Sequence, residues 1–386
     1  MSSQLSHLGY CTNVHAGADL ERTRANLEKH ALAVKQQFSP DKSMGVGLWL
    51  SSPAARKLIE AKQVDDFGGW LAAVGLVPFT LNGFPYGDFH QPVVKHRVYQ
   101  PTWCAEERLR YTLDLIQILD GILPPGMAGS ISTLPIAWPA PALSADDFDR
   151  AAANLRSVAT TLRQLEETTG RLIFVCIEPE PGCVLQYTED VVRFFEDHLL
   201  KSDDEPSVRR YLRVCHDVCH ADVMFESQHD AIRRYRSAGI EIGKVQISSA
   251  VHMPLDQLDE AQRQTAVTQL TQFAEDRYLH QTMVRHAGRQ RFFEDLPLAL
   301  KTHPPSGEWR VHFHVPIYLE SFGELKTSRA EILECLDATR EFSDVRHFEV
   351  ETYAWGVLPP GLRHEQLASG IAQELRWFAE HASTPL

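Results

Sequence analysis

The sequence predicts an α/β protein, a (β/α)₈ barrel built from one domain. Short apolar runs alternate with helical patterns of about 12 to 20 residues, which is typical of parallel α/β architecture. The first predicted strand is not followed by a Gly-x-Gly-x-x-Gly turn, so a barrel is favoured over a dinucleotide-binding sheet. The chain has 386 residues. A barrel needs about 250, so longer loops or an insertion must account for the remainder.

The first half of the chain is expected to contain four strands, each followed by a helical stretch. Ser51 and Pro53 form a helix-start signal, and Ser144 opens the fourth helix in the same way. The loop at 83–100 is rich in aromatic residues, Gly, Pro and His, and a loop of this length after a strand is expected to cover a site. The expected strands are 8–15, 44–50, 76–82 and 127–134, and the expected helices are 18–38, 51–75, 105–119 and 144–168.

The second half of the chain gives one strand too many for an eight-stranded barrel. Strands are expected to end at Glu178, Asp217 and Glu351, with two further strands at 244–248 and 309–318. This makes nine, and the sequence leaves open which strand lies outside the barrel. Residues 252–306 are expected to be an insertion, with a helix at 258–276 and a hairpin formed by 278–285 and 290–294.

Composition limits the partners and the compartment. Lys and Arg number 38 against 51 Asp and Glu, a net charge of −13, which argues against a nucleic-acid binder. No apolar window approaches the roughly 18 residues of a membrane span, and the N-terminus lacks the features of a signal peptide. Seven scattered cysteines indicate a reducing, cytoplasmic location rather than a disulfide framework.

Three predicted strands end in a carboxylate. Short apolar runs lead into Glu178, Asp217 and Glu351, and His220 follows Asp217 by three residues. Parallel strands of a barrel end at the same face, so these side chains are expected to gather there. Carboxylate and imidazole ligands in one place favour a divalent cation.

Several phrases of the chain resemble known proteins in order. The strand ends resemble the xylose isomerase-like barrel superfamily, the group of sugar-phosphate isomerases and epimerases. Over residues 9 to about 360, the chain most resembles the EboE family, which is named for a role in metabolite traffic. The phrases that carry this resemblance are GYCTNVHAG at 9–17, TLNGFPYGDFH at 80–90, CHDVCH at 215–220, VHFHVPIY at 311–318 and EVETYAW at 349–355.

The superfamily resemblance implies a metal held by Glu, Asp, His and Glu from four late strands. Glu178, Asp217 and Glu351 match the first, second and last of these ligands. The position of the third ligand, in direct order, is Gln246, and the alternatives are His312 and His314. We place the ligand on His314, because imidazole is the stronger donor and Pro316 marks the strand end beside it. His312 would lie about 6.6 Å deeper on the same strand face.

The leading hypothesis is a metal-dependent isomerase or epimerase of a small polyhydroxy or keto metabolite. Zn, Mn, Mg or Co would polarise the substrate oxygens, and Glu178 or Glu351 would move the proton, with His220 in the catalytic set. The alternatives are a non-catalytic metabolite carrier and a metal-dependent hydrolase. A homo-oligomer is compatible with the sequence. Residues at the strand ends and in the loop at 83–100 are expected to contact substrate: His15, Asn82 and His90.

Overall fold

The chain folds into a closed barrel of eight parallel strands. The computed structural model describes residues 7–201, 204–363 and 366–383. The strands follow one another around the barrel in the order β1-β14-β7-β6-β5-β4-β3-β2, as the sequence predicts for a (β/α)₈ fold. Their bounds are β1 His7–Cys11, β2 Met44–Leu48, β3 Leu76–Asn82, β4 Gly129–Thr133, β5 Ile173–Ile177, β6 Leu212–Asp217, β7 Ile242–Ile247 and β14 His347–Val350.

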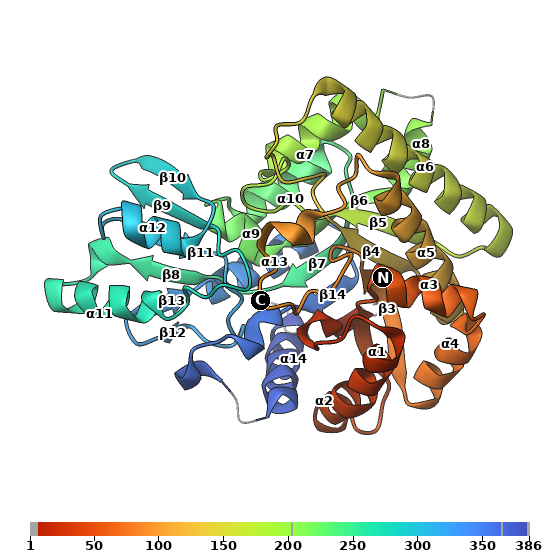
Figure 1. Ribbon diagram of the computed structural model, residues 1–386, viewed down its shortest axis with the longest axis horizontal. Helices are drawn as coiled ribbons and strands as arrows, with labels where there is room; N and C mark the ends of the chain where they lie inside the picture. The colour runs from red at the N-terminus through yellow and green to blue at the C-terminus, as the bar shows by residue number, and fades with distance from the viewer. Residues whose placement is uncertain (1–6, 202–203, 364–365, 384–386) are drawn as a thin grey trace.

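Helices surround the barrel and cover its outer face (Figure 1). None of the helices in the described part of the chain is long and apolar enough to cross a membrane. The helices of the barrel layer are α1 Leu20–Asn26, α2 Leu32–Phe38, α3 Ser52–Glu60, α4 Val64–Ala73, α5 Glu106–Ile122, α6 Ala145–Thr169, α7 Thr188–Phe194, α8 Glu205–Tyr211, α9 Val218–Val223, α10 Gln228–Ser237, α13 Arg329–Phe342 and α14 Leu367–Ser383.

The helix boundaries follow from local side-chain chemistry. The Ser51 hydroxyl accepts from the backbone N–H of Ala54, and Pro53 occupies the first turn of α3. Ser144 and Asp147 form a reciprocal capping box at the start of α6, and Gly170 ends that helix in the left-handed conformation. The expected helix over 18–38 is α1 and α2 joined through a π-helical turn at Leu27–Ala31, and the expected helix over 51–75 is two helices, α3 and α4.

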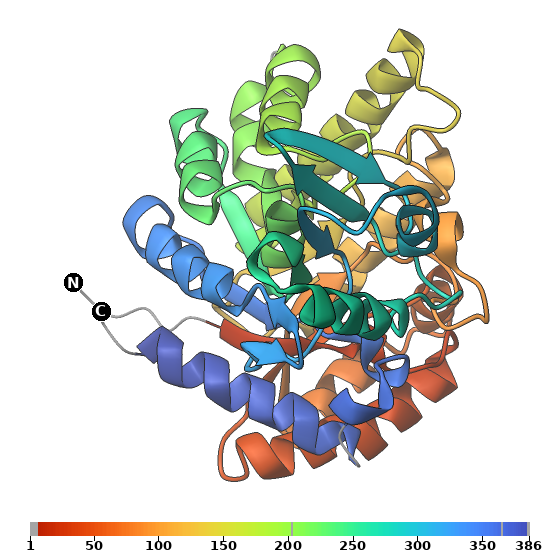
Figure 2. The ribbon, with the colours of Figure 1, turned by 90° about the vertical axis from the view of Figure 1, so that its left-hand side faces the viewer.

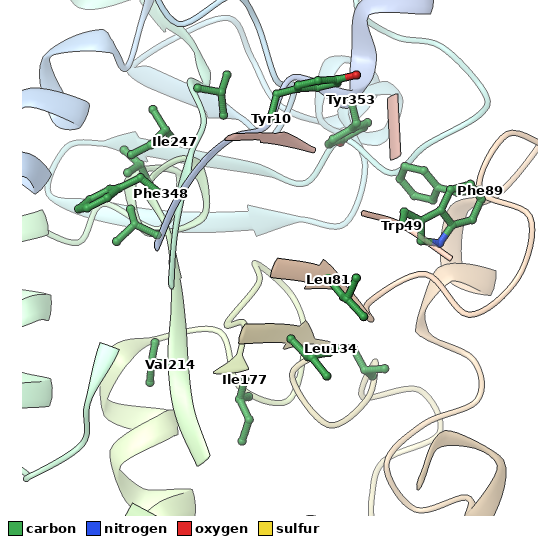
Figure 3. Packing of buried hydrophobic residues seen from close by; sticks show 14 of the residues in the cluster. Tyr10, Trp49, Leu81, Phe89, Leu134, Ile177, Val214, Ile247, Phe348 and Tyr353 are labelled. Atoms are coloured by element: carbon green, nitrogen blue, oxygen red, sulfur yellow. The ribbon is translucent and has the colours of Figure 1, made fainter. Parts of the chain in front are cut away.

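Alternation along β7 and β14 places apolar residues on the outer face of the barrel and polar residues on the inner face. Ile177, Val214, Ile247 and Phe348 are buried between the strands and the surrounding helices, as part of the main hydrophobic cluster (Figure 3). Gln246 and Glu349, which precede Ile247 and follow Phe348, are polar and lie in the barrel interior. Polar and charged side chains therefore gather in the barrel interior, and the outer face of the strands packs against the helices through apolar side chains.

A second sheet of six strands lies between β7 and β14 in the chain and covers one end of the barrel (Figure 2). Helices α11 Glu260–Thr271 and α12 Leu296–Thr302 belong to the same segment. This segment is longer than the insertion expected at 252–306. In sheet order, its strands are β10 Arg289–Phe293, β9 Thr282–His286, β11 Glu308–Val311, β8 Val251–Pro254, β13 Leu325–Thr327 and β12 Ser321–Phe322.

The second sheet shows which of the nine expected strands lies outside the eight-stranded barrel. β11 pairs antiparallel with β8 and β9, so the strand expected at 309–318 lies outside the barrel and ends early, at Val311. The barrel neighbours of β14 are β1 and β7. The idea that His314 stands on a barrel strand beside β14 is therefore wrong, because the strand before it uses its backbone groups for the second sheet.

A buried ion pair fills the middle of the barrel. Lys244 Nζ of β7 lies 2.5 Å from Glu349 Oε2 of β14, and both side chains are fully buried. Asn82 donates to Glu349 Oε1 at 3.0 Å and accepts from Lys244 Nζ at 2.9 Å. Gly47 makes room for this arrangement, since a Cβ at that position would lie 1.3 Å from Glu349 Oε1.

Candidate metal centre

Three carboxylates meet at the carboxyl end of the barrel strands. Glu178 follows β5, Asp217 ends β6, and Glu351 follows β14. One oxygen from each lies within 4.8 Å of the others, and all three side chains are buried. Adjacent parallel strands bring these positions together, because each strand reaches the same end of the barrel.

The charges of this cluster oppose one another. Burial raises the pKa of Glu178, and the nearby Glu351 and Asp217 carboxylates raise it further. Burial and Asp217 also raise the pKa of Glu351, to about 8. Asp217 behaves differently. Burial opposes its ionisation, but His220, His314 and the backbone N–H of His220 hold its pKa below the ordinary value. A cation in this cluster would relieve the repulsion among the carboxylates.

Three histidines border the carboxylates. His220 comes from α9, one turn after Asp217, whereas His312 and His314 lie just beyond β11 of the second sheet. The backbone N–H of His312 donates to Gln281 O at 2.9 Å, and that of Val315 donates to Ser249 O at 3.0 Å. These bonds hold the segment against the end of β7, so His314 comes within 4.8 Å of Asp217 and His220 without belonging to a barrel strand.

Two imidazoles face each other through their Nε2 atoms. His220 Nδ1 lies 2.8 Å from the carbonyl oxygen of Pro179, so this nitrogen carries the proton. His312 Nδ1 lies 2.7 Å from Gln281 Oε1 and is protonated for the same reason. The two Nε2 atoms are 3.3 Å apart. The two Nε2 atoms are therefore close enough to share one proton or to bind one cation.

The donor set fits a divalent cation. Among the described residues, Asp217 Oδ2 and both ring nitrogens of His314 are buried without a hydrogen-bond partner. Buried polar atoms are rarely left unpaired, and these three belong to the groups that gather around the carboxylates. Burial lowers the pKa of His314 to about 4, although Asp217 acts in the opposite direction, so its imidazole is neutral and able to ligate. Carboxylate oxygens and one imidazole suit Zn, Mn, Mg or Co.

Gln246 lies inside the barrel, where β7 pairs it with Asp217 of β6. Its Nε2 donates to Asn82 Oδ1 at 3.2 Å. Gln246 Oε1 has no partner among the described residues and remains free to accept a hydrogen bond. The position that the resemblance assigns to a third metal ligand is therefore occupied by an amide, which is hydrogen-bonded through Asn82 to the Lys244–Glu349 ion pair.

The three residues expected to contact substrate occupy different places. Asn82 lines the cavity above the carboxylates, but its amide is engaged by the ion pair beneath. His90 lies behind the cavity wall, where its Nε2 is 2.6 Å from the carbonyl oxygen of Asn13. His15 belongs to a separate small cavity next to Trp49, stacked on His30 and 3.0 Å from the Tyr10 hydroxyl.

Residues that the sequence did not assign complete the site. Asn13 follows β1 and donates from Nδ2 to Glu351 Oε1 at 2.7 Å. Glu180 accepts from the Tyr99 hydroxyl at 2.7 Å and from Gln281 Nε2 at 2.9 Å, and its carboxylate lies within 4.8 Å of His220 and His312. The polar end of β1 gives a weak signal for Asn13. Gln281 has no such signal, because it enters from the second sheet.

The fold is that of a xylose isomerase-like TIM barrel. A protein of that description from Mycobacterium smegmatis, solved in complex with magnesium, superposes with a TM-score of 0.55 at 10% identity over 99% of this chain and 98% of its own. No protein-family model and no curated protein matches the sequence.

Two further solved structures are similar over nearly their whole length. The probable 3-DHS dehydratase AsbF from Bacillus anthracis has a TM-score of 0.48 at 12% identity, covering 97% of this chain and 99% of its own. The IOLI protein with a bound zinc atom has a TM-score of 0.48 at 12% identity, covering 98% of each chain.

Proposed function

We propose that this protein is a metal-dependent isomerase or epimerase that acts on a small hydroxy or keto metabolite. The observation that carries the proposal is the cluster of Glu178, Asp217 and Glu351, three buried carboxylates within 4.8 Å beside histidines. Such a cluster costs folding free energy unless a cation neutralises it, which marks a site kept for function rather than stability.

Glu178, Asp217, Glu351 and His314 would hold the cation. When bound, a divalent cation polarises substrate oxygens and stabilises negative charge that develops on them. Asn13 donates to Glu351 Oε1, which fixes the carboxylate and leaves Oε2 directed to other partners. Gln281 fixes the tautomer of His312 in the same manner through Nδ1.

The chain's own groups can move a proton between adjacent substrate carbons. Glu178 and Glu351 both line the cavity, so either carboxylate can remove a proton from a carbon next to a carbonyl and return it to the neighbouring carbon or the opposite face. His220 also lines the cavity, and its Nε2 carries a lone pair that can accept a hydroxyl proton. Burial of all three keeps bulk water from competing for the proton.

A metabolite carrier without catalysis is the second candidate. Gln246, where the resemblance implies a histidine ligand, favours it, as does the resemblance to a family named for metabolite traffic. The two functions share a binding site and differ in whether a substrate C–H bond is broken, so fold alone does not separate them.

The test combines metal analysis with proton exchange. The purified protein, loaded in turn with Zn, Mn, Mg and Co, is incubated in D₂O with a panel of hydroxy ketones, and carbon-bound deuterium is measured. We expect about one equivalent of metal and metal-dependent exchange, both lost in Glu351→Gln and retained in the control Glu196→Gln, which changes an exposed carboxylate. Metal binding without exchange across the panel would support the carrier, and absence of metal binding would refute the metal-dependent isomerase or epimerase.

A further inference from the structure

The cavity above the carboxylates has a polar floor and an apolar wall. It has an open volume of about 600 Å³. Its polar lining groups gather around Glu178, Glu351 and His220 at the strand ends. The loop that follows β3 and the segment before β9 supply the wall. The wall residues are Phe84, Phe89, Val94, Val98, Tyr278 and Leu279.

Three polar groups on or beside this wall already have partners within the protein. The Tyr99 hydroxyl donates to Glu180 Oε1 at 2.7 Å, and the Tyr278 hydroxyl donates to the carbonyl oxygen of Phe89 at 3.2 Å. The Lys95 ammonium forms an ion pair with Asp295. A substrate hydroxyl placed against the apolar side chains of the wall would give up water without receiving an equivalent bond, which weakens its binding.

Aromatic rings make the wall rigid as well as apolar. The rings of Phe89, Tyr278 and Tyr353 contact one another, with centroid distances of 4.9 Å, 5.6 Å and 5.0 Å for Phe89–Tyr278, Phe89–Tyr353 and Tyr278–Tyr353. Tyr353 in turn contacts the His314 ring at 4.6 Å, so the aromatic wall reaches the metal-binding floor (Figure 3 labels Phe89 and Tyr353). Such preformed apolar surfaces favour a flat or compact apolar group next to a polar head.

We infer that the substrate is amphipathic, with two neighbouring oxygen atoms that reach the floor and an apolar body of about the size of an aromatic ring that packs on the wall. Free sugars and sugar phosphates do not fit this division, since their hydroxyl groups surround the whole molecule. The inference rests on the proposed metal-dependent function for the polar head, while the apolar body follows from the wall alone.

Two hydroxamates distinguish the contribution of the polar head to binding from that of the apolar body. Benzohydroxamate and acetohydroxamate carry the same chelating group, and only the first has an aromatic body. Isothermal titration of the metal-loaded protein is expected to show benzohydroxamate bound at least about 10-fold more tightly, because the phenyl group buries apolar area on the wall. Xylitol serves as the polyol without an apolar face and is expected to bind more weakly than benzohydroxamate.

Variants of the wall test whether it causes the preference for benzohydroxamate. Phe84→Ala and Val98→Thr are expected to reduce the difference in affinity between the two hydroxamates. Val98→Thr keeps the side-chain volume and changes only its polarity. Val93→Ala alters an exposed residue of the same loop and should leave this difference unchanged. Thermal melting confirms that each variant is folded.

The outcomes distinguish this inference from the proposed function. Equal affinity for both hydroxamates, or tighter binding of xylitol, overturns the amphipathic substrate and leaves the metal site standing. Benzohydroxamate bound equally well with and without metal supports the apolar body and overturns the metal-dependent function. Failure of both hydroxamates to bind the loaded protein overturns both.

Discussion

Glu349 and Glu351 stand two residues apart at the end of one strand, and both enter the barrel interior. Glu349 is neutralised by Lys244 at 2.5 Å and bonded to Asn82. Glu351 instead lies within 4.8 Å of Glu178 and Asp217, and its polar partner in the described structure is the neutral amide of Asn13. The lower layer is a satisfied ion pair, and the upper layer is a set of like charges.

This difference separates the residues that hold the barrel from those that act in it. Although burial disfavours the ammonium, Glu349 raises the pKa of Lys244, so Lys244 keeps its positive charge. A buried pair with good partners resists the loss of either member. Three clustered carboxylates gain from losing a charge or from receiving a cation. The same residue type therefore has opposite effects on stability in adjacent layers.

The largest effect is expected from breaking the lower layer. Lys244→Met should reduce the free energy of unfolding by about 3–5 kcal/mol, because it leaves Glu349 as an uncompensated buried charge. Chemical denaturation measures this change. Lys57→Met removes a lysine from an exposed ion pair with Glu21 and should leave the free energy of unfolding nearly unchanged. A similar loss in both variants would show that the buried pair has no special role.

The same substitution in the two layers should give opposite results. In metal-free protein, Glu349→Gln should destabilise the fold by about 3 kcal/mol, whereas Glu351→Gln should be neutral or stabilising by about 1 kcal/mol, since burial and the neighbouring carboxylates already disfavour the charged form of Glu351. Added metal at 100 times its dissociation constant should stabilise the wild type by about 2.7 kcal/mol and leave Glu351→Gln unchanged. Strong destabilisation of metal-free Glu351→Gln would contradict the comparison.

The imidazole of His314 should contribute more to metal affinity than the amide of Gln246. His314→Ala is expected to weaken metal binding by roughly 100-fold. Loss of a residue that only supports a ligand costs about 10- to 100-fold, and loss of a ligand itself should reach the upper end of that range. Gln246→Ala should leave metal affinity nearly unchanged, because Gln246 bonds to Asn82 and not to the carboxylates. Competition with a chelator measures both affinities, and the reverse order would restore Gln246 to the ligand set.

The smallest effect on metal affinity is expected from removing the hydrogen-bond donor to Glu351. Asn13→Ala should weaken metal binding by roughly 10-fold, because the carboxylate loses the donor that orients it. His15→Ala is the matched control, since His15 lies in a separate cavity and should leave the affinity unchanged. Equal affinities for the wild type and Asn13→Ala would assign Asn13 a packing role only.

The sequence determined the barrel and the origin of its carboxylates through local signals. Apolar runs, capping residues such as Ser144 and glycines such as Gly170 define strands and helices wherever they occur in a chain. Once the strands are parallel, their ends share one face, so Glu178, Asp217 and Glu351 come together without further information. The polar residue at a strand end is thus readable before any packing is known.

Tertiary structure alone decided how the second sheet joins the site. The residues at 309–318 have the pattern of a buried strand, but pattern does not state which neighbour receives the backbone hydrogen bonds. β11 pairs with β8 and β9 outside the barrel, and His312 and His314 reach the carboxylates from beyond its end. Gln281 and the apolar wall arrive by the same route. Contacts between segments far apart in the chain depend on packing and closure, which no local pattern encodes.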